Sequence, residues 1–341
     1  MSQSNINSKK SIIQNIKNFK IYLNERFPLG KNSFFVLIFT LSGYIYTSLL
    51  YNSKIMYLFT NGVKIGIFQY KIIALFIIVF MFFFQLRITD EFKDYEEDLK
   101  YRAYRPVQRG IISLKTLGKT GIVTVIIQIM LAHVIDPEII YFMIFVWIYM
   151  FLMAKEFFIK KWLTKRILIY ALSHVVIMVF ITLVIVEATQ YIVPKNIFDV
   201  FILQRYRHNI DFALIPLFAL NYLNGIVLEI GRKTRRTDEE EYGVQTYSKL
   251  WGRKKAVVVL SLLFVIEYLL VILGLTHTYK EYFFFGGLTL LVILIVSIYF
   301  IVKFLKKDLS GKIVETVSGL WIIFSSMCMG FLPYFVFSLI K

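Results

Sequence analysis

The sequence is poor in charge and nearly free of cysteine, and each shortage excludes a class of protein. Only 18% of the 341 residues are charged and 58% are hydrophobic, whereas an ordinary soluble domain has about 25% charged and 45–50% apolar residues. The one cysteine, Cys328, excludes a disulfide framework and a zinc site built from cysteines. Strict alternation of apolar and polar residues is missing, which argues against a β-barrel. The composition therefore indicates a polytopic membrane protein.

Acidic residues are also scarce relative to basic ones. The chain has 22 Asp and Glu against 39 Lys and Arg, which gives a net charge of +17. A protein that recognises nucleic acid by its sequence needs a polar domain, and this sequence has no room for one. We therefore expect no nucleic acid among the partners. Cationic loops that hold helices in a bilayer with an anionic inner face explain the excess.

Apolar runs of membrane-spanning length recur along the whole chain. About nine are present, near residues 32–51, 70–89, 112–135, 139–158, 167–188, 210–230, 255–274, 282–302 and 318–340. They predict an all-α polytopic membrane protein, with about nine helices in one bundle around a central cavity. Loops rich in Lys and Arg alternate with poorer ones, beginning with a rich segment before the first run. The positive-inside rule then places the N-terminus in the cytoplasm and the protein in the cytoplasmic membrane.

The chain divides into a short N-terminal segment, residues 1–31, and one membrane domain, residues 32–341. Within the first part Ile12, Ile16, Phe19 and Leu23 share one helical face. This pattern predicts an amphipathic helix on the cytoplasmic membrane surface. A flexible tail is the alternative.

The first cluster of acids follows the second apolar run, in a loop predicted to be cytoplasmic. Asp90, Asp94 and Asp98 are spaced four residues apart and line one helical stripe, which Glu91 joins. Like charges at this spacing repel, so the row suggests a bound cation. Carboxylates without nearby Cys or His favour Mg²⁺ or Mn²⁺, and Mg²⁺ is usually held together with substrate phosphates. Three arginines come directly after these acids, and arginines are suited to binding the phosphates of a substrate: Arg102, Arg105 and Arg109. A solvated charged loop is the alternative.

A second polar cluster lies at the predicted inner end of the sixth run. One helical side carries Asn221, Asn224, Gly225, Glu229, Arg232 and Lys233. Polar groups at membrane depth are expensive and usually face a cavity. The alternative is a basic collar at the interface, with the acids of residues 238–241 as its counter-charges.

Together the two clusters resemble the signatures of the UbiA superfamily of intramembrane prenyltransferases. The first signature of that family has the form N-D-x-x-D-x-x-x-D, followed by R-P and a glycine. The chain matches this form with Asp90, Glu91, Asp94, Asp98, Arg105, Pro106 and Gly110. Asp90 stands where the family has Asn, and Glu91 where it has Asp. The resemblance extends over nearly the whole chain.

The second signature, D-x-x-x-D-x-x-x-G with a further glycine nine residues on, is matched less completely. Glu239 takes the second acidic position, but Arg235 falls at the first. The two glycines keep their spacing, as Gly243 and Gly252. The missing carboxylate is expected from Glu229 or Asp238, and the second metal is less secure than the first.

The resemblance implies Mg²⁺-dependent transfer of an isoprenyl group from a polyprenyl diphosphate to a hydrophobic or aromatic acceptor in the bilayer, at a site facing the cytoplasm. The catalytic acids would be Asp90, Glu91, Asp94, Asp98, Glu229, Asp238 and Glu239. Of these, the metal ligands would be Asp90, Glu91, Asp94, Asp98 and Glu239. The diphosphate would meet Arg102, Arg105, Arg109, Lys155, Arg232 and Lys233. The acceptor or cavity would be lined by Asn221, Asn224, Tyr149 and His174.

Several of these assignments have alternatives. His174 lies within a membrane run, where a histidine is a functional candidate by default, but a packing role is equally compatible with the sequence. Lys155 and Glu156 could form a local ion pair. A terpene cyclase on the same scaffold is a second reading of the whole chain. A non-enzymatic transporter or lipid-binding protein is a third, although the acids lie at helix ends and not at the midplane.

Overall fold

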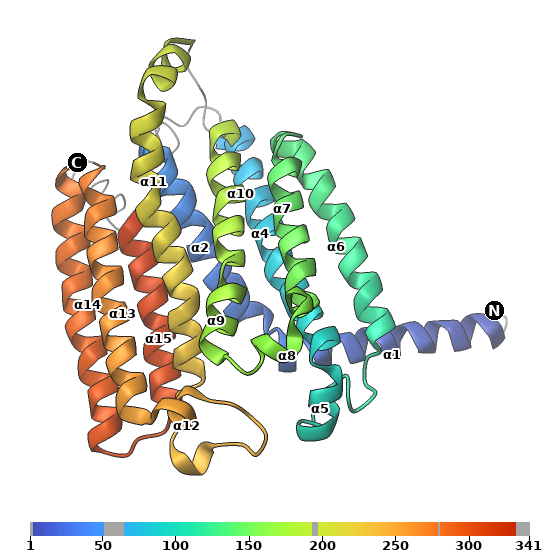
Figure 1. The fold of residues 1–341 in the computed structure, drawn as a ribbon. Coiled ribbons are helices and arrows are strands. Elements are labelled where there is room, and N and C mark those ends of the chain that lie inside the picture. The colour runs from blue at the N-terminus through green and yellow to red at the C-terminus, as the bar shows by residue number, and fades with distance from the viewer. Residues whose placement is uncertain (1–2, 51–64, 193–196, 279, 332–341) are drawn as a thin grey trace.

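The computed structural model describes residues 3–50, 65–192, 197–278 and 280–331, and within these ranges it contains helices and loops without strands. The helices stand side by side in one bundle (Figure 1). In chain order they are α1 Gln3–Arg26, α2 Leu29–Leu50, α4 Ile65–Lys93, α5 Tyr95–Tyr101, α6 Leu114–Ile135, α7 Ile139–Ala154, η1 Glu156–Phe158, α8 Lys160–Leu163, α9 Ile167–Val175, α10 Ile177–Ile192, α11 Ile197–Arg232, η2 Thr237–Glu239, α12 Tyr247–Trp251, α13 Arg253–Thr276, α14 Lys280–Lys306, α15 Lys312–Ser326 and η3 Met327–Phe331.

Eight of the described helical stretches are long and apolar enough to cross a membrane. They are Leu29–Leu50, Tyr70–Lys93, Leu114–Ile135, Ile167–Ile192, Phe212–Arg232, Arg253–Thr276, Phe283–Lys306 and Lys312–Phe331. Helix α7 is equally apolar but has only 16 residues. The predicted fold class, an all-α polytopic membrane protein, is confirmed. Each predicted run overlaps one of these helices, and residues 332–340 of the last run lie outside the described residues.

One helix ends earlier than its apolar run predicts. The run 139–158 continues past Ala154, but α7 stops there. The reason lies in the backbone, because Glu156, Phe157 and Phe158 have φ values of 49°, 52° and 61°. This left-handed conformation cannot continue a right-handed helix. Hydrophobicity therefore overestimates the length of α7, since the turn is set by tertiary contacts and not by polarity.

Close approach and buried polar contacts hold the helices together. A Cβ atom on Gly330 would lie only 2.3 Å from the carbonyl oxygen of Ser42, so η3 can approach α2 only with glycine at this position. Between α4 and α6, the side-chain amide of Gln85 donates to Gln128 at 2.7 Å and to Thr124 at 2.9 Å. Small residues and interhelical hydrogen bonds are the usual contacts between membrane helices, because lipid provides no hydrophobic drive for their association.

Helix α1 lies across one end of the bundle and projects away from it (Figure 1). Tyr22 and Phe27 are buried against Phe84 and Ile88 near the end of α4. Ile16, which lies closer to the N-terminus of α1, is exposed. Helix α1 is thus packed against the part of α4 that leads into the first acidic cluster, and its place on a membrane surface stays a prediction.

Candidate active site

The two acid-bearing stretches lie at the same end of the bundle, where Figure 1 shows α5 and α12. We call residues 90–98 the first acidic segment and residues 229–241 the second. Just beyond them, the rings of Tyr101 and Tyr242 have centroids 6.2 Å apart. Gly243 has φ +77°, and a Cβ atom there would lie 2.6 Å from the Tyr101 ring. The end of α5, after the first segment, therefore touches the loop that follows the second segment.

The first acidic segment keeps its carboxylates on one stripe although α4 ends at Lys93. The backbone amide of Asp94 donates to the carbonyl of Asp90 at 2.9 Å, and that of Asp98 donates to Asp94 at 2.8 Å. These are the i to i−4 bonds of a continuing helix. The stripe predicted from the spacing is therefore present in the backbone.

Two carboxylates of this stripe are already bound by arginines. Asp98 is buried and accepts hydrogen bonds from Arg102, at 3.0 Å, and from Arg105. Glu91 is also buried, and its Oε1 lies 2.6 Å from Nε of Arg26 in α1. These arginines satisfy charges that would be very costly to bury alone.

The other two carboxylates are held less tightly, because the contacts of Asp90 are longer and Asp94 has none among the described residues. Asp90 has 41% of its side chain exposed and lies 3.4 Å from Arg87 and 3.9 Å from Lys93. In the described part of the chain, no hydrogen bond or ion pair joins the Asp94 side chain. Burial raises the pKa of Asp94 to about 6, and the nearby carboxylates of Asp90 and Asp98 add to the shift against the charge of Lys93. A carboxyl group in this setting gains most from a bound cation.

The second acidic segment presents no free carboxylate pair. Glu239 accepts hydrogen bonds from the backbone amides of Gly311, at 2.8 Å, and Arg236, at 3.1 Å, and from the hydroxyl of Ser310. These bonds outweigh the effect of burial and lower its pKa to about 2. Asp238 is held by both ends of the Arg236 guanidinium. Glu239 thus fastens the η2 turn to the loop before α15.

Glu229, the third predicted acid of this segment, and Arg235, at the first acidic position of the second signature, are paired as well. Oxygen atoms of Glu229 lie 2.6 Å from Arg232 and 2.5 Å from Lys233. Arg235, at the position where an acid is expected, lies 3.2 Å from Glu315 of α15. Of these cations, Arg232 also interacts electrostatically with Asp90 of the first acidic segment.

These surroundings fit one metal ion better than two. Among the described residues, no three His, Cys, Asp or Glu side chains are grouped as a complete metal site. Magnesium, however, is commonly held by one or two carboxylates and completed by substrate phosphates and water. Asp90 and Asp94 satisfy that description. The predicted acids of the second segment, Glu229, Asp238 and Glu239, do not, because each is held by neighbouring cations or amides.

The other predicted residues fall in different places. Arg109 forms an ion pair with Glu25 of α1 at 2.7 Å, and Lys155 is exposed at the end of α7. The hydroxyl of Tyr149 donates to the carbonyl oxygen of Ser173 at 2.6 Å, between α7 and α9. These three predicted residues thus lie at different points around the site and do not share a ligand in this arrangement.

Both predicted amides are buried between helices. Asn221 donates to Thr182 of α10 at 3.0 Å. Asn224 contacts Ser325 and Ser326 of α15, at 3.3 Å and 3.4 Å. In this conformation they join α11 to its neighbours, and a role toward an acceptor stays a prediction.

A polar group that no sequence motif marks surrounds Glu156. Lys93 donates to the hydroxyl of Tyr170 at 2.6 Å, and that hydroxyl donates to Glu156 at 3.3 Å. Nε2 of His174 lies 3.3 Å from Oε2 of Glu156. The sequence offered only weak signals, an acid after an apolar helix and a histidine within another, because the four residues come from three separate stretches.

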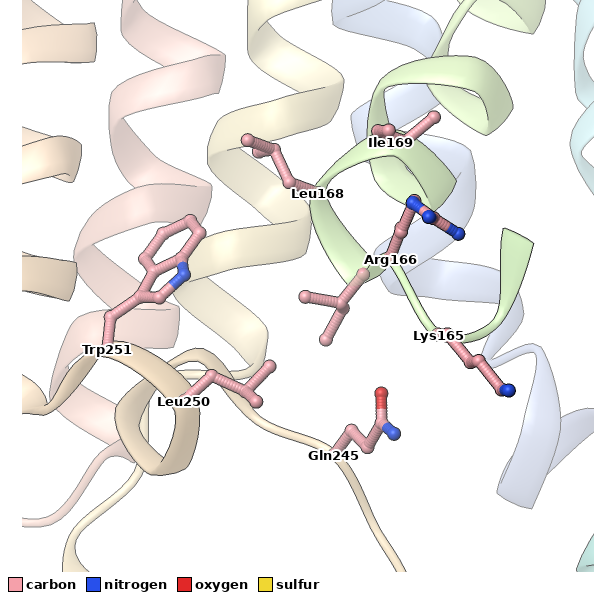
Figure 2. Close-up of a pocket in the computed structure, with 8 residues that line it drawn as sticks. Lys165, Arg166, Leu168, Ile169, Gln245, Leu250 and Trp251 are labelled. Carbon is pink, nitrogen blue, oxygen red and sulfur yellow. The ribbon is translucent and has the colours of Figure 1, made fainter. Parts of the chain in front are cut away.

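A pocket of about 520 Å³ opens between the start of α9 and the loop into α12. Figure 2 shows the basic side chains of Lys165 and Arg166 on the α9 side, with Gln245 and Trp251 on the other. Apolar side chains complete the lining: Ile167, Leu168, Ile169 and Leu250. The pocket is suited to an amphiphilic molecule with an anionic group.

The fold and the site define a class, an all-helical integral membrane protein with acidic and basic groups gathered at one end of its bundle. The model of the UbiA prenyltransferase family matches residues 55–312. The chain therefore belongs to this family of intramembrane prenyltransferases. The expected resemblance is confirmed over well more than half of the chain.

Solved structures agree with this fold. A UbiA homologue from Aeropyrum pernix K1 is similar with a TM-score of 0.60 at 13% identity, covering 89% of this chain and 98% of that one. A UbiA homologue from Archaeoglobus fulgidus bound to DMAPP and Mg²⁺ gives 0.54 at 11% identity, covering 90% and 98%. A digeranylgeranylglyceryl phosphate synthase gives 0.53 at 19% identity, covering 92% and 98%. No curated protein matches the chain significantly.

Proposed function

We propose that this protein transfers an isoprenyl group from a polyprenyl diphosphate to a hydrophobic or aromatic acceptor within the membrane. The observation that carries the proposal is the pair of less tightly held carboxylates, Asp90 and Asp94, on one stripe at the end of the bundle where the two acidic segments meet. Family membership supports prenyl transfer in general. The structure of the Archaeoglobus homologue with DMAPP and Mg²⁺ supports a prenyl diphosphate donor.

In this proposal Asp90 and Asp94 hold a single Mg²⁺ ion together with oxygen atoms of the diphosphate. Bound there, the ion would neutralise charge that develops on the leaving diphosphate. Arg232, which pairs with Glu229, also interacts electrostatically with Asp90 and would add positive charge near the leaving group. Arg102 and Arg105 act indirectly, since they hold Asp98 in place. The active site then faces the cytoplasm, as the basic loops predict.

The acceptor would approach through the pocket between α9 and α12. Its cations, Lys165 and Arg166, suit an anionic group, and its apolar lining suits a ring or a hydrocarbon. Arg166 is held over the ring of Trp162, 4.3 Å from the ring centroid. This side chain is therefore fixed in position at the mouth of the pocket.

The experiment is a product analysis. The purified full-length protein in lipid nanodiscs is incubated with Mg²⁺, prenyl diphosphates of increasing chain length and a panel of acceptors: a hydroxybenzoate, a dihydroxynaphthoate and a glycerol phosphate. Mass spectrometry of the extracted lipids should find a prenylated acceptor, formed only when Mg²⁺ and an acceptor are both present. A cyclic or rearranged hydrocarbon formed without an acceptor would indicate the cyclase reading. Failure to consume any diphosphate would contradict both.

A further inference from the structure

Glu156 is a buried acid with an unusual set of neighbours. Only 4% of the residue is exposed. Its carboxylate faces Lys93 of α4 at 3.8 Å, Tyr170 of α9 at 3.3 Å and His174 of α9 at 3.3 Å. These are the titratable groups that meet it from the elements packed against the turn. None of them is among the proposed metal ligands, Asp90 and Asp94.

The backbone that presents Glu156 is strained. Three consecutive residues without the freedom of glycine, Glu156, Phe157 and Phe158, have φ values between 49° and 61°. Such conformations persist only where the surroundings over-determine them, and they concentrate at functional sites. The Phe157 ring packs edge-on against the His174 ring, with centroids 5.6 Å apart. The turn therefore directs the carboxylate inward and fixes the imidazole at the same time.

The hydrogen bonding of His174 leaves one of its ring nitrogens, Nε2, able to accept a proton. Its Nδ1 atom lies 2.8 Å from the carbonyl oxygen of Tyr170. A carbonyl oxygen can only accept, so Nδ1 carries the hydrogen and Nε2 of the neutral ring has a lone pair. That lone pair faces Oε2 of Glu156, and neither atom has another hydrogen-bond partner in the described structure. Two buried acceptors facing each other are relieved when a proton lies between them.

The ionised state of Glu156 is favoured in this setting. Burial alone would raise the pKa of its carboxyl group, but the contact with His174 and the charge of Lys93 outweigh burial and lower it. The carboxylate is thus ready to share a proton that reaches His174. Stacking of the Tyr170 and His174 rings, with centroids 3.9 Å apart, keeps the imidazole in this orientation.

Contacts connect this pair to the proposed metal site through Lys93, and to the proposed acceptor pocket through helix α9. Nζ of Lys93 is 3.9 Å from Asp90 on one side and 3.8 Å from Glu156 on the other. On α9, Ile167 lines the pocket, and Tyr170 and His174 follow at three and seven residues, so all three lie on one face. Helix α9 thus carries both part of the pocket lining and the two residues that contact Glu156.

We propose that Glu156 and His174 form the base that receives the proton of the acceptor during prenyl transfer. The assignment rests on the proposed function. The C–O bond of the prenyl diphosphate breaks and its electron pair leaves with the diphosphate. The electron pair of the acceptor's oxygen or ring carbon forms the new bond to the prenyl carbon. The proton released from that atom is taken up between Nε2 of His174 and Oε2 of Glu156, which share it, and passes later to water.

The test separates proton removal from donor binding. Glu156→Gln and His174→Gln are compared with the wild type in nanodiscs, with Glu97→Gln and His133→Gln as controls because these two residues are exposed. Donor binding is measured with a prenyl thiolodiphosphate, a non-reacting analogue, in the presence of Mg²⁺. Turnover is measured between about pH 5 and about pH 9, with the acceptor of the panel above that gives the highest wild-type rate.

We expect both variants to lose at least about 100-fold in kcat, the usual contribution of a general base. They should keep a Kd for the analogue within about threefold of the wild type, and lose the fall in rate at acidic pH that the wild type shows. Wild-type kcat with an unchanged pH profile would overturn the assignment, as would loss of analogue binding in both variants. A wild-type protein that binds no analogue and prenylates no acceptor would instead overturn the proposed function itself.

Discussion

Arg26 of α1 forms an ion pair with buried Glu91, at 2.6 Å between Nε and Oε1. The pair joins residues 65 positions apart and fixes the N-terminal helix to the first acidic segment. Glu91 stands at an acidic position of the first family signature, where a metal ligand is expected. In this structure its charge is balanced by an arginine, which changes the role that we expect for it.

Removing Arg26 should destabilise the protein more than removing both partners. Arg26→Ala leaves a buried carboxylate without its counter-charge, which costs about 3 kcal/mol in free energy of unfolding. Adding Glu91→Gln to the same protein should restore most of that loss. The check is denaturant unfolding in detergent micelles. Equal stability of the single and double variants would contradict a structural pairing of the two residues.

Asp94 should control both activity and the response to metal. Asp94→Asn is expected to lower turnover by at least about 100-fold, because the variant loses a carboxylate proposed to hold the ion. Glu97→Gln, which removes an exposed acid three residues away, should stay near the wild-type rate. Steady-state kinetics of the two variants side by side make the comparison. A wild-type rate for Asp94→Asn would remove the acid from the site.

The pH dependence of the metal-free protein follows from the same residue. The pKa of Asp94 is raised to about 6 in the folded protein, so ionising this group in the absence of metal works against folding. Stability without Mg²⁺ should therefore fall as the pH rises from about 4 toward 6, and stay lower above it. Asp94→Asn should flatten that decline in Tm. The prediction would be wrong if the Tm of the wild type and the Tm of Asp94→Asn changed in parallel across this pH range.

Glu239 should act in the opposite direction. Its pKa is lowered to about 2 by the hydrogen bonds from Ser310, Gly311 and Arg236. The stability that it contributes is present above its ordinary pKa and is lost as the pH falls toward 2. Glu239→Gln should cost about 1 kcal/mol near neutral pH, a modest value for a half-exposed group. Unfolding free energies at neutral and acidic pH test this, and a loss that persists unchanged in acid would argue against it.

The number of metal ions is open to direct measurement. Because Glu229, Asp238 and Glu239 are held by their neighbours, we expect about one Mg²⁺ to be taken up with each prenyl thiolodiphosphate. The slope of log Kd for the analogue against log free Mg²⁺ concentration gives that number. A slope near two would mean that Glu239 or Glu229 leaves its present partners when the donor binds.

Much of the architecture is visible in the sequence, because length and apolarity alone dictate which stretches can lie in a bilayer. The stripe of Asp90, Asp94 and Asp98 is equally visible, since helical periodicity needs no tertiary information. The residue that pairs with each carboxylate, in contrast, cannot be predicted from the sequence. Arg26 approaches Glu91, and Gly311 approaches Glu239, only after the chain has folded.

The same limit applies to helix ends and to groups assembled from several helices. The left-handed turn at Glu156 ends α7 inside an apolar run, and no composition rule marks it. Lys93 and Tyr170 meet Glu156 through the packing of α4 and α9 against that turn. Arg102 and Arg105 come after the acids of the first signature in the sequence, but their contacts with Asp98 depend on the turn after α5.

The measurement that tests the central claim most directly is calorimetric titration of a prenyl thiolodiphosphate into the wild type, Asp90→Asn, Asp94→Asn and Glu97→Gln, with and without Mg²⁺. Our account predicts Mg²⁺-dependent binding to the wild type and to Glu97→Gln, and loss of that dependence when either Asp90 or Asp94 is changed. Equal Mg²⁺-dependent binding by all four proteins would contradict it.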